Sequence, residues 1–374
     1  MRIIVTGGGT AGHINPALAI ASYFKEKHSE TQILYIGNHG GMEEKLVPAA
    51  GYDFKSVKIS GFRRKLSPQN ICKNISTIFK VFKSSSDAKK IIKQFNPDLC
   101  IGTGGYVCGP VILAAIKLGV PSFVHESNSY PGVTVKMLAK KVDAVMLATE
   151  HAKQFFDKNT NIVVTGNPVR QTMIGRDKDE ARKKLGLNEK PMILSFGGSL
   201  GSAEINKVIA PFLERSSKDN KYQHIHGYGM AKEYQNYKNE IKIDKENKSL
   251  CVLEYISNMP DCLAAADLVI SRAGAMTVAE ISVMGKASIL IPSPNVTENH
   301  QFHNAMSLVN AGAADIIEEK DLSAKILMEK ADKILESRET INKFSENAKK
   351  VYSKDALEKI YQISIKAIKI LSNK

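Results

Sequence analysis

Short apolar segments alternate with helix-like segments along almost the whole chain, and this alternation restricts the possible folds more than any other feature of the sequence. In the first half the expected strands are residues 3–6, 32–36, 54–59, 99–102, 122–125 and 144–147. In the second half they are residues 192–196, 224–227, 252–255, 268–271, 288–291 and 315–317. Strands that alternate with helices in this way form parallel sheets with helices on both faces. The sequence therefore predicts an α/β fold.

The alternation pauses near residue 165 and then restarts, which predicts two domains. A chain of 374 residues is long enough for two hydrophobic cores. We expect two Rossmann-like domains with parallel sheets facing a cleft, the first at residues 1–164 and the second at 165–355. The last expected helix, 356–371, has no strand after it and could pack back on the first domain.

The chain is strongly basic, with 52 Lys and Arg against 38 Asp and Glu and a formal net charge of +14. Such an excess indicates an anionic partner, which could be nucleic acid, a phosphorylated substrate or an acidic membrane surface. Apart from one segment, lysines are not interleaved with aromatic residues, and no nucleic-acid-binding motif is present. We therefore expect no nucleic-acid partner.

Cysteine usage and hydropathy indicate the compartment. The five cysteines include no C-x-x-C pair, which is typical of reduced thiols in the cytoplasm. The chain enters a strand-like run without a cationic leader, so we expect no secretory signal. No apolar stretch approaches the ~20 residues that span a bilayer, so we expect any membrane contact to be peripheral.

One segment interrupts the alternation. Gly61-Phe62-Arg63-Arg64-Lys65 leads into apolar residues at helical spacing that include Ile75, Phe79 and Phe82, with Lys73, Lys80 and Lys83 between them. An apolar stripe at this spacing packs into a core or, with a dense basic rim, lies on a membrane surface. Both interpretations stay open from the residues alone.

Three glycine-rich loops each follow an expected strand and precede an expected helix. They are Gly7–Gly12, Gly102-Thr103-Gly104-Gly105 and Gly197-Gly198-Ser199-Leu200-Gly201. Glycine lets backbone N–H groups approach a ligand, and the helix N-terminus behind adds unpaired donors, so each loop is a candidate phosphate site. A single loop of this kind is more often a tight turn, but three favour bound phosphates.

Two other chemistries fit single loops. Gly7, Gly9 and Gly12 match the dinucleotide-binding spacing, but no acid ends the second strand at Gly37-Asn38 to bind a ribose. We also expect the helix to begin only at Pro16, with Asn15 as its cap, which leaves His13 in the loop. The third loop fits the nucleophile elbow of α/β-hydrolases, with Ser199 as nucleophile and Asp267 and His300 or His303 as partners.

A metal site is not expected. The Asp-x-Asp spelling that sugar transferases use for a metal occurs as Asp177-Lys178-Asp179. Because these residues precede a helix-like segment, we expect Asp177 to cap a helix instead.

The motifs together resemble the MurG family of bacterial UDP-N-acetylglucosamine transferases. In the first half the resemblance rests on Gly8-Gly9-Thr10-Ala11-Gly12-His13, Gly104-Gly105-Tyr106-Val107 and His125-Glu126-Ser127-Asn128. In the second half it rests on Gly166-Asn167-Pro168-Val169-Arg170, the third glycine loop, Arg272–Glu280 and Asn299-His300-Gln301. Two departures are Ala11 and His300, where many relatives have Gly and Gln.

The resemblance implies a GT-B fold and an inverting, metal-independent transfer without a cofactor. N-acetylglucosamine would pass from UDP to the 4-hydroxyl of undecaprenyl-pyrophosphoryl-muramyl-pentapeptide during peptidoglycan synthesis, and so serve cell shape and division. The enzyme would act at the cytoplasmic face of an anionic cell membrane, docked through Ile75, Phe79 and Phe82. The alternatives are another UDP-sugar transferase of this fold and the hydrolase.

The resemblance also assigns residues. The donor would contact Thr10, Ala11, Gly12, Asn128, Arg170, Ser199, Ile256, Ala275, Met276, Thr277, Val278, Ala279, Glu280, His300 and Gln301. Glu280 would hold the ribose hydroxyls. The acceptor diphosphate would contact Gly8, Gly9, Gly104, Gly105 and Tyr106. His13 is the first candidate for the base because imidazole titrates near neutrality, and Glu126 is the second.

Overall fold

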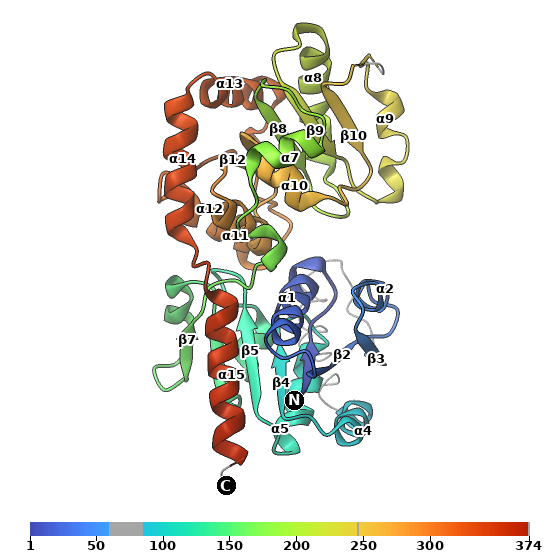
Figure 1. The fold of residues 1–374 in the computed structure, drawn as a ribbon, viewed down its shortest axis with the longest axis vertical. Coiled ribbons are helices and arrows are strands. Elements are labelled where there is room, and N and C mark those ends of the chain that lie inside the picture. Colours follow the sequence, from blue (N-terminus) through green and yellow to red (C-terminus); the bar gives the residue numbers. More distant parts are fainter. Residues whose placement is uncertain (60–84, 245–246, 373–374) are drawn as a thin grey trace. The chain divides into compact units, whose positions relative to one another are not determined.

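The computed structural model describes residues 1–59, 85–244 and 247–372. The chain divides into two compact units: unit 1 is Met1–Val169 with Asp355–Lys374, and unit 2 is Arg170–Lys354. Each unit contains one parallel sheet with helices packed against it (Figure 1). The predicted membrane segment with Ile75, Phe79 and Phe82 lies outside the described residues.

Unit 1 contains, within the described residues, a seven-stranded parallel sheet in the order β3-β2-β1-β4-β5-β6-β7. Its strands are β1 (Arg2–Thr6), β2 (Gln32–Asn38), β3 (Asp53–Val57), β4 (Leu99–Gly102), β5 (Ser122–Glu126), β6 (Ala144–Leu147) and β7 (Ile162–Val164). Sequence reasoning missed β7, which has only three residues, and expected β3 to extend to residue 59.

The helices of unit 1 are α1 (Ala11–Lys27), α2 (Glu43–Ala49), α4 (Ser85–Phe95), α5 (Cys108–Lys117), α6 (Val133–Leu138), the 3-10 turn η1 (Glu150–Phe155) and α15 (Ala356–Ser372). Alternate strand residues face opposite sides, so two cores form. Helices α4, α5 and α6 bury one face of the sheet, and α1, α2 and α15 bury the other.

The C-terminal helix α15 packs on α1 within unit 1 (Figure 1). Leu357 and Ile360 enter the core beneath it, and the Tyr361 ring lies 5.3 Å from that of Phe24. Lys27 pairs with Glu358 at 2.9 Å on the surface. A helix far along the chain thus completes the cover of the first sheet.

The start of α1 differs from the prediction. The helix begins at Ala11 with Thr10 as its cap residue, so Pro16 lies inside it and His13 lies in its first turn rather than in the loop. The amides of His13 and Ile14 both bond to the Thr10 carbonyl, which closes that turn. Pro16 has no N–H for the Gly12 carbonyl. Because Gly12 is exposed, water can satisfy that carbonyl instead.

Unit 1 continues to Val169, five residues past the expected boundary at Val164. Three contacts hold this extension: the Thr165 amide donates to Leu147 O at 2.9 Å, His125 Nε2 bonds Gly166 O at 2.9 Å, and the Asn167 amide side chain bonds Ser127 O at 3.0 Å. Burial lowers the pKa of His125 to about 4, so this histidine is a neutral structural donor.

Unit 2 contains, in the part of the chain that is described, a six-stranded parallel sheet in the order β10-β9-β8-β11-β12-β13. Its strands are β8 (Met192–Phe196), β9 (Gln223–Gly227), β10 (Leu250–Leu253), β11 (Leu268–Ser271), β12 (Ala287–Leu290) and β13 (Ala314–Ile316). The strand expected at 252–255 begins two residues earlier. Each remaining boundary agrees within two residues.

The helices of unit 2 are α7 (Lys178–Lys184), α8 (Ala203–Asp219), α9 (Tyr237–Glu240), α10 (Met259–Ala265), α11 (Ala275–Met284), α12 (His300–Val309), α13 (Ala324–Leu335) and α14 (Arg338–Val351). The 3-10 turns in the described part of this unit are η2 (Gln171–Met173), η3 (Lys232–Tyr234), η4 (Thr297–Asn299) and η5 (Glu319–Asp321). Apolar residues of α8 and α13 bury one face of this sheet.

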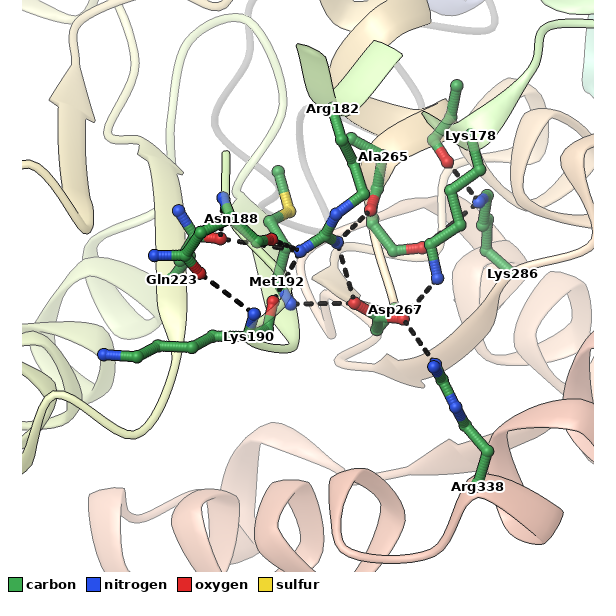
Figure 2. Close-up of polar contacts among 12 residues, drawn as sticks. Lys178, Arg182, Asn188, Lys190, Met192, Gln223, Ala265, Asp267, Lys286 and Arg338 are labelled. Carbon is green, nitrogen blue, oxygen red and sulfur yellow. Dashed lines mark hydrogen bonds and ion pairs between the residues drawn. The ribbon is translucent and has the colours of Figure 1, made fainter. Parts of the chain in front are cut away.

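A buried carboxylate organises the amino edge of the second sheet (Figure 2). Asp267, immediately before β11, accepts the Met192 amide of β8 at 2.9 Å and pairs with Lys178 at 2.5 Å and Arg182 at 3.2 Å. Burial acts to raise the pKa of Asp267, but the bonds from Lys178 and the Met192 amide outweigh it and hold that pKa below its usual value. Breaking such a buried pair typically costs about 3–5 kcal/mol.

Candidate active site

In each sheet the order in which successive strands are added reverses once, between β1 and β4 in unit 1 and between β8 and β11 in unit 2. Ligands of open parallel sheets bind outside the carboxyl ends of the strands at such a reversal. The glycine loops follow β1, β4 and β8, so all three lie at these positions. Both units therefore carry a candidate site at the same place in their topology.

In unit 1 the first two glycine loops pack directly against each other. A Cβ on Gly7 would lie 2.2 Å from Thr103 Oγ1, and one on Gly105 would lie 2.2 Å from the Gly8 carbonyl oxygen. Gly105 also has a φ of +78°. These glycines are required because the two loops approach each other too closely for a side chain, whether or not a phosphate binds there.

A carboxylate that sequence reasoning missed lies beside the first loop. Glu43, fully buried on α2, accepts the Asn38 amide at 2.9 Å and the Gly9 amide at 3.3 Å. The side chain of Asn38 in turn donates to the Tyr106 hydroxyl at 3.1 Å. The Gly9 amide expected to hold an acceptor phosphate thus already donates to an acid. No local sequence signal distinguishes Glu43 from an ordinary helix-start acid.

The His13 imidazole is held by the second loop. Its Nδ1 lies 3.1 Å from the Thr103 carbonyl oxygen, and the Thr103 hydroxyl donates to the His13 carbonyl at 2.7 Å. A carbonyl can only accept, so Nδ1 carries the proton in the neutral ring and Nε2 does not. This tautomer gives Nε2 the lone pair that a general base needs.

Glu126, the second candidate base, ends β5 and is 3% exposed. Its Oε1 accepts both the backbone and the side-chain amides of Asn128 at 2.9 Å, and its Oε2 accepts the Gly132 amide at 2.7 Å. Burial raises the pKa of Glu126 against the lowering effect of these bonds. Its carboxylate therefore shapes the loop after β5 and commits the Asn128 side chain to that loop.

In unit 2 a cavity of about 390 Å³ lies at the carboxyl ends of the strands. Its walls come from the segments after β8, β11, β12 and β13: Gly197, Gly201, Ser202, Ala203, Glu204, Arg272, Ser293, Asn295, Gln301 and Glu319. The third glycine loop forms one side of it. Among the residues assigned from sequence, only Gln301 is a wall residue of this cavity.

Arg272 connects two walls of this cavity. It was not identified as a site residue from the sequence. It donates to Ser202 Oγ at 2.7 Å and pairs with Glu319 at 2.5 Å. The sequence contained Arg272 in a family motif but gave no indication of Glu319, which lies 47 positions later.

Helix α11 starts at the cavity end of β11 with Gly274 as its cap residue. Of residues 275–279 only Thr277 is partly exposed, so the others would contact a ligand through the backbone. Glu280 is 9% exposed, and burial raises its pKa to about 7 while the charge of Arg170 lowers it. Glu280 is therefore poised to change charge near neutral pH.

The remaining assigned residues surround the same edge. Gln301 Oε1 accepts the Ser293 amide at 2.9 Å, which leaves the amide NH₂ as the group that can donate. His300 begins α12 directly after Glu298 and Asn299, whose φ angles of 52° and 49° are rare outside glycine. Ile256 is buried against Gly227 at the end of β9.

The hydrolase interpretation is wrong. Asp267 bonds the amide of Met192, the first residue of β8, whereas Ser199 follows the last residue of that strand. The two side chains therefore lie at opposite edges of the sheet. Asp267 is also paired with Lys178 and Arg182, so it cannot orient a histidine for Ser199.

The expected helix cap at Asp177 is confirmed, because its carboxylate accepts the amides of Asp179 and Glu180 at 2.9 Å. Over residues 1–59, 85–244 and 247–372, His, Cys, Asp and Glu side chains form no cluster suited to a metal ion. In the same ranges no helix has the length and apolar character that crossing a bilayer requires.

Comparison with known proteins covers both units. Residues 3–147 match the glycosyltransferase family 28 N-terminal domain, and residues 192–360 match the glycosyltransferase family 28 C-terminal domain. A UDP-N-acetylglucosamine–N-acetylmuramyl-(pentapeptide) pyrophosphoryl-undecaprenol N-acetylglucosamine transferase of Acetivibrio thermocellus is 43% identical over 97% of both chains. The enzyme of the same name from Bacillus cytotoxicus is also 43% identical, over 97% of this chain and 98% of the relative.

Solved structures agree with the sequence relatives. The crystal structure of Acinetobacter baumannii MurG superposes with a TM-score of 0.74 at 27% identity, covering 98% of this chain and 99% of that one. A UDP-GlcNAc 2-epimerase from Neisseria meningitidis superposes with a TM-score of 0.66 at 15% identity, covering 98% and 100%, and shares the fold alone. The predicted GT-B fold class is confirmed, and the chain belongs to the MurG family of glycosyltransferase family 28.

Proposed function

We propose that this chain transfers N-acetylglucosamine from UDP-N-acetylglucosamine to undecaprenyl-pyrophosphoryl-N-acetylmuramyl-pentapeptide in peptidoglycan synthesis. The main support for this proposal is that relatives named for this reaction are 40–43% identical to this chain over almost their whole length. The bond between the sugar's C1 and UDP breaks, the acceptor 4-hydroxyl oxygen bonds C1 from the opposite face, and that hydroxyl loses its proton to a base. The product linkage is β.

The donor site of this proposal is the cavity in unit 2 and the adjoining start of α11. The cavity lies at the strand reversal that parallel sheets use for nucleotides. The Glu280 carboxylate accepts both ribose hydroxyls, and the NH₂ of Gln301 donates to the sugar, with His300 beside it. The uracil contacts backbone at Ile256, as the family resemblance implies.

The departing UDP needs positive potential. Backbone amides of residues 275–279 at the N-terminus of α11 and those of the loop with Ser199 supply it, together with the guanidinium of Arg170. Arg170 is exposed and acts electrostatically on Glu280, which supports its position near the nucleotide.

His13 is the proposed base and Glu126 a structural residue. The Thr103 carbonyl fixes the His13 tautomer, whereas both Glu126 oxygens already accept amide protons. The family resemblance also implies sugar contacts for Thr10, Ala11 and Gly12, which lie in the same turn as His13, and for Asn128. The acceptor diphosphate binds the amides of Gly8, Gly9, Gly104 and Gly105 beside Tyr106, and it must displace the Gly9 amide from Glu43.

The enzyme acts at the cytoplasmic face of the membrane as a peripheral protein, because its acceptor carries an undecaprenyl chain. The net charge of +14 suits an anionic leaflet, at about 1 kcal/mol per basic residue near the surface. Ile75, Phe79 and Phe82 are the proposed apolar contacts.

Donor specificity tests the function directly. We expect the purified chain to transfer sugar from UDP-N-acetylglucosamine to the lipid-linked muramyl acceptor at least 100-fold faster than from UDP-glucose, because a site that bonds a polar group rejects a donor lacking it. Radiolabelled transfer measures both rates. Equal rates with several UDP-sugars would support the alternative of a different UDP-sugar transferase.

His13→Ala should lower kcat by about 100-fold or more and leave the KM for UDP-N-acetylglucosamine nearly unchanged, because it removes a transition-state interaction. Steady-state kinetics measure this split. His39→Ala is the matched control, since His39 is an exposed histidine of the same unit. A near-normal kcat in His13→Ala would show that His13 is not the base and would leave Glu126 as the candidate.

The affinity for UDP-N-acetylglucosamine should fall as the pH is lowered from 8 to 6. The pKa of Glu280 is raised to about 7, so the carboxylate that accepts the ribose hydroxyls is lost below that pH. The decrease is at most about tenfold per pH unit for one proton. Calorimetry should show a weaker but pH-independent affinity in Glu280→Gln; an unchanged slope in that variant would refute the role.

Membrane docking is tested by co-sedimentation with vesicles of anionic lipid. The double variant Phe79→Ser, Phe82→Ser should lose most of its binding, because insertion of two aromatic side chains into the bilayer would contribute several kcal/mol to the binding free energy. Wild-type binding should weaken as salt rises. Full binding by the double variant would place these residues in the core.

A further inference from the structure

We propose that Glu319 is a positioning residue for the donor sugar-nucleotide, acting through Arg272 on the shape of the cavity in unit 2. The inference rests on the proposed function, because it takes this cavity as the donor site. Glu319 begins the 3-10 turn after β13 and lies on the cavity wall with Arg272. Neither the family motifs nor local sequence patterns assign it a role.

The argument starts from the bonds of one guanidinium. Arg272 follows β11, and its Nη1 donates to the carbonyls of Ile291 and Pro292, which follow β12, at 3.2 and 3.3 Å. Its Nη2 donates to Ser202 Oγ, which lies after β8, at 2.7 Å. Arg272 thus fastens the segments that follow three neighbouring strands.

Glu319 adds a fourth segment, the one that follows β13, and the negative charge that pairs with Arg272. Its carboxylate lies 2.5 Å from Nη2 of Arg272, and both side chains are mostly buried, at 14% and 18% exposed. Carbonyl and hydroxyl oxygens accept hydrogen bonds but leave the positive charge unneutralised. Glu319 is the acid that pairs with this guanidinium, so it favours the conformation in which Arg272 reaches all three partners.

The partners of Arg272 are themselves wall elements. Ser202 is the cap residue of α8, where its Oγ accepts the Ile205 amide, and the Ile291–Pro292 carbonyls precede Ser293, whose amide bonds Gln301. A shift of Arg272 would therefore move the start of α8 and the segment that holds Gln301. The consequence falls on binding of the donor rather than on the acceptor's proton.

The cavity offers a matched control. Glu204, in the first turn of α8, is a second carboxylate on the same wall, and no ion pair joins it to Arg272 among the described residues. Removing either acid makes the cavity less negative by one charge. Only removal of Glu319 frees Arg272.

The test compares Glu319→Ala, Glu319→Gln and Glu204→Ala by steady-state kinetics and by calorimetry with UDP. Glu319→Ala should raise the KM for UDP-N-acetylglucosamine and the Kd for UDP about tenfold, with kcat within threefold, because the ion pair that shapes the wall is lost. Glu319→Gln keeps the size of the side chain but removes its charge, so it should weaken binding about as much as Glu319→Ala. Glu204→Ala should bind UDP at least as tightly as the wild type.

Opposite outcomes overturn the inference. An unchanged or lower Kd for UDP in Glu319→Ala would show that Glu319 does not position Arg272. An equal increase of that Kd in Glu204→Ala would show that the effect comes from the net charge of the cavity and not from Arg272. Wild-type binding in Glu319→Gln would also contradict the inference, because that variant lacks the negative charge on which the inference depends. Thermal unfolding of each variant identifies a folding defect. If Glu319→Ala does not fold, the Kd of Glu319→Gln tests the inference. Failure of the wild type to bind UDP would overturn the proposed function itself.

Discussion

Close approach of neighbouring loops at the carboxyl edge of each sheet is the constraint on which both candidate sites depend. In a parallel sheet adjacent strands end side by side, so the loops after them compete for the same space. In unit 1 this brings Gly8 against Gly105, and in unit 2 Gly201 against Gly229, where an added Cβ would meet backbone at 2.2 Å. Only glycine permits either contact. The imidazole of His13 reaches the Thr103 carbonyl because the loops of unit 1 are this close.

The charges near these loops differ from those of the chain as a whole. The chain carries an excess of 14 positive charges, yet Glu43 lies beside the first glycine loop, and Glu204 and Glu319 are on the cavity wall of unit 2. In the function that we propose, oriented backbone amides and helix N-termini, together with Arg170, supply the positive potential for a diphosphate. The excess of Lys and Arg suits the anionic membrane surface that we propose presents the lipid-linked acceptor.

Stability and chemistry occupy opposite edges of the second sheet. At the amino edge, Asp267 gathers Lys178 and Arg182, and the ammonium of Lys286 donates to the carbonyls of Ala264 and Ala266 at 2.6 and 3.1 Å (Figure 2). Burial lowers the pKa of Lys286 to about 7. Asp267 and its partners at this edge hold β8 and β11 in register. The loops at the opposite ends of the same strands are therefore available for ligand binding.

The amino-acid sequence alone predicted the α/β class, two parallel-sheet domains, the positions of the glycine loops and the motifs of the family, because these depend on local periodicity and on residue types at short spacing. It failed at the start of α1, where proline inside a helix was read as its first residue, and it did not find Glu43 or Glu319. Tertiary packing sets which strand ends are neighbours, which tautomer His13 adopts and what Arg272 binds. Those contacts join residues 30 to 90 positions apart, and packing of the whole unit, rather than any local pattern, fixes which side chains meet.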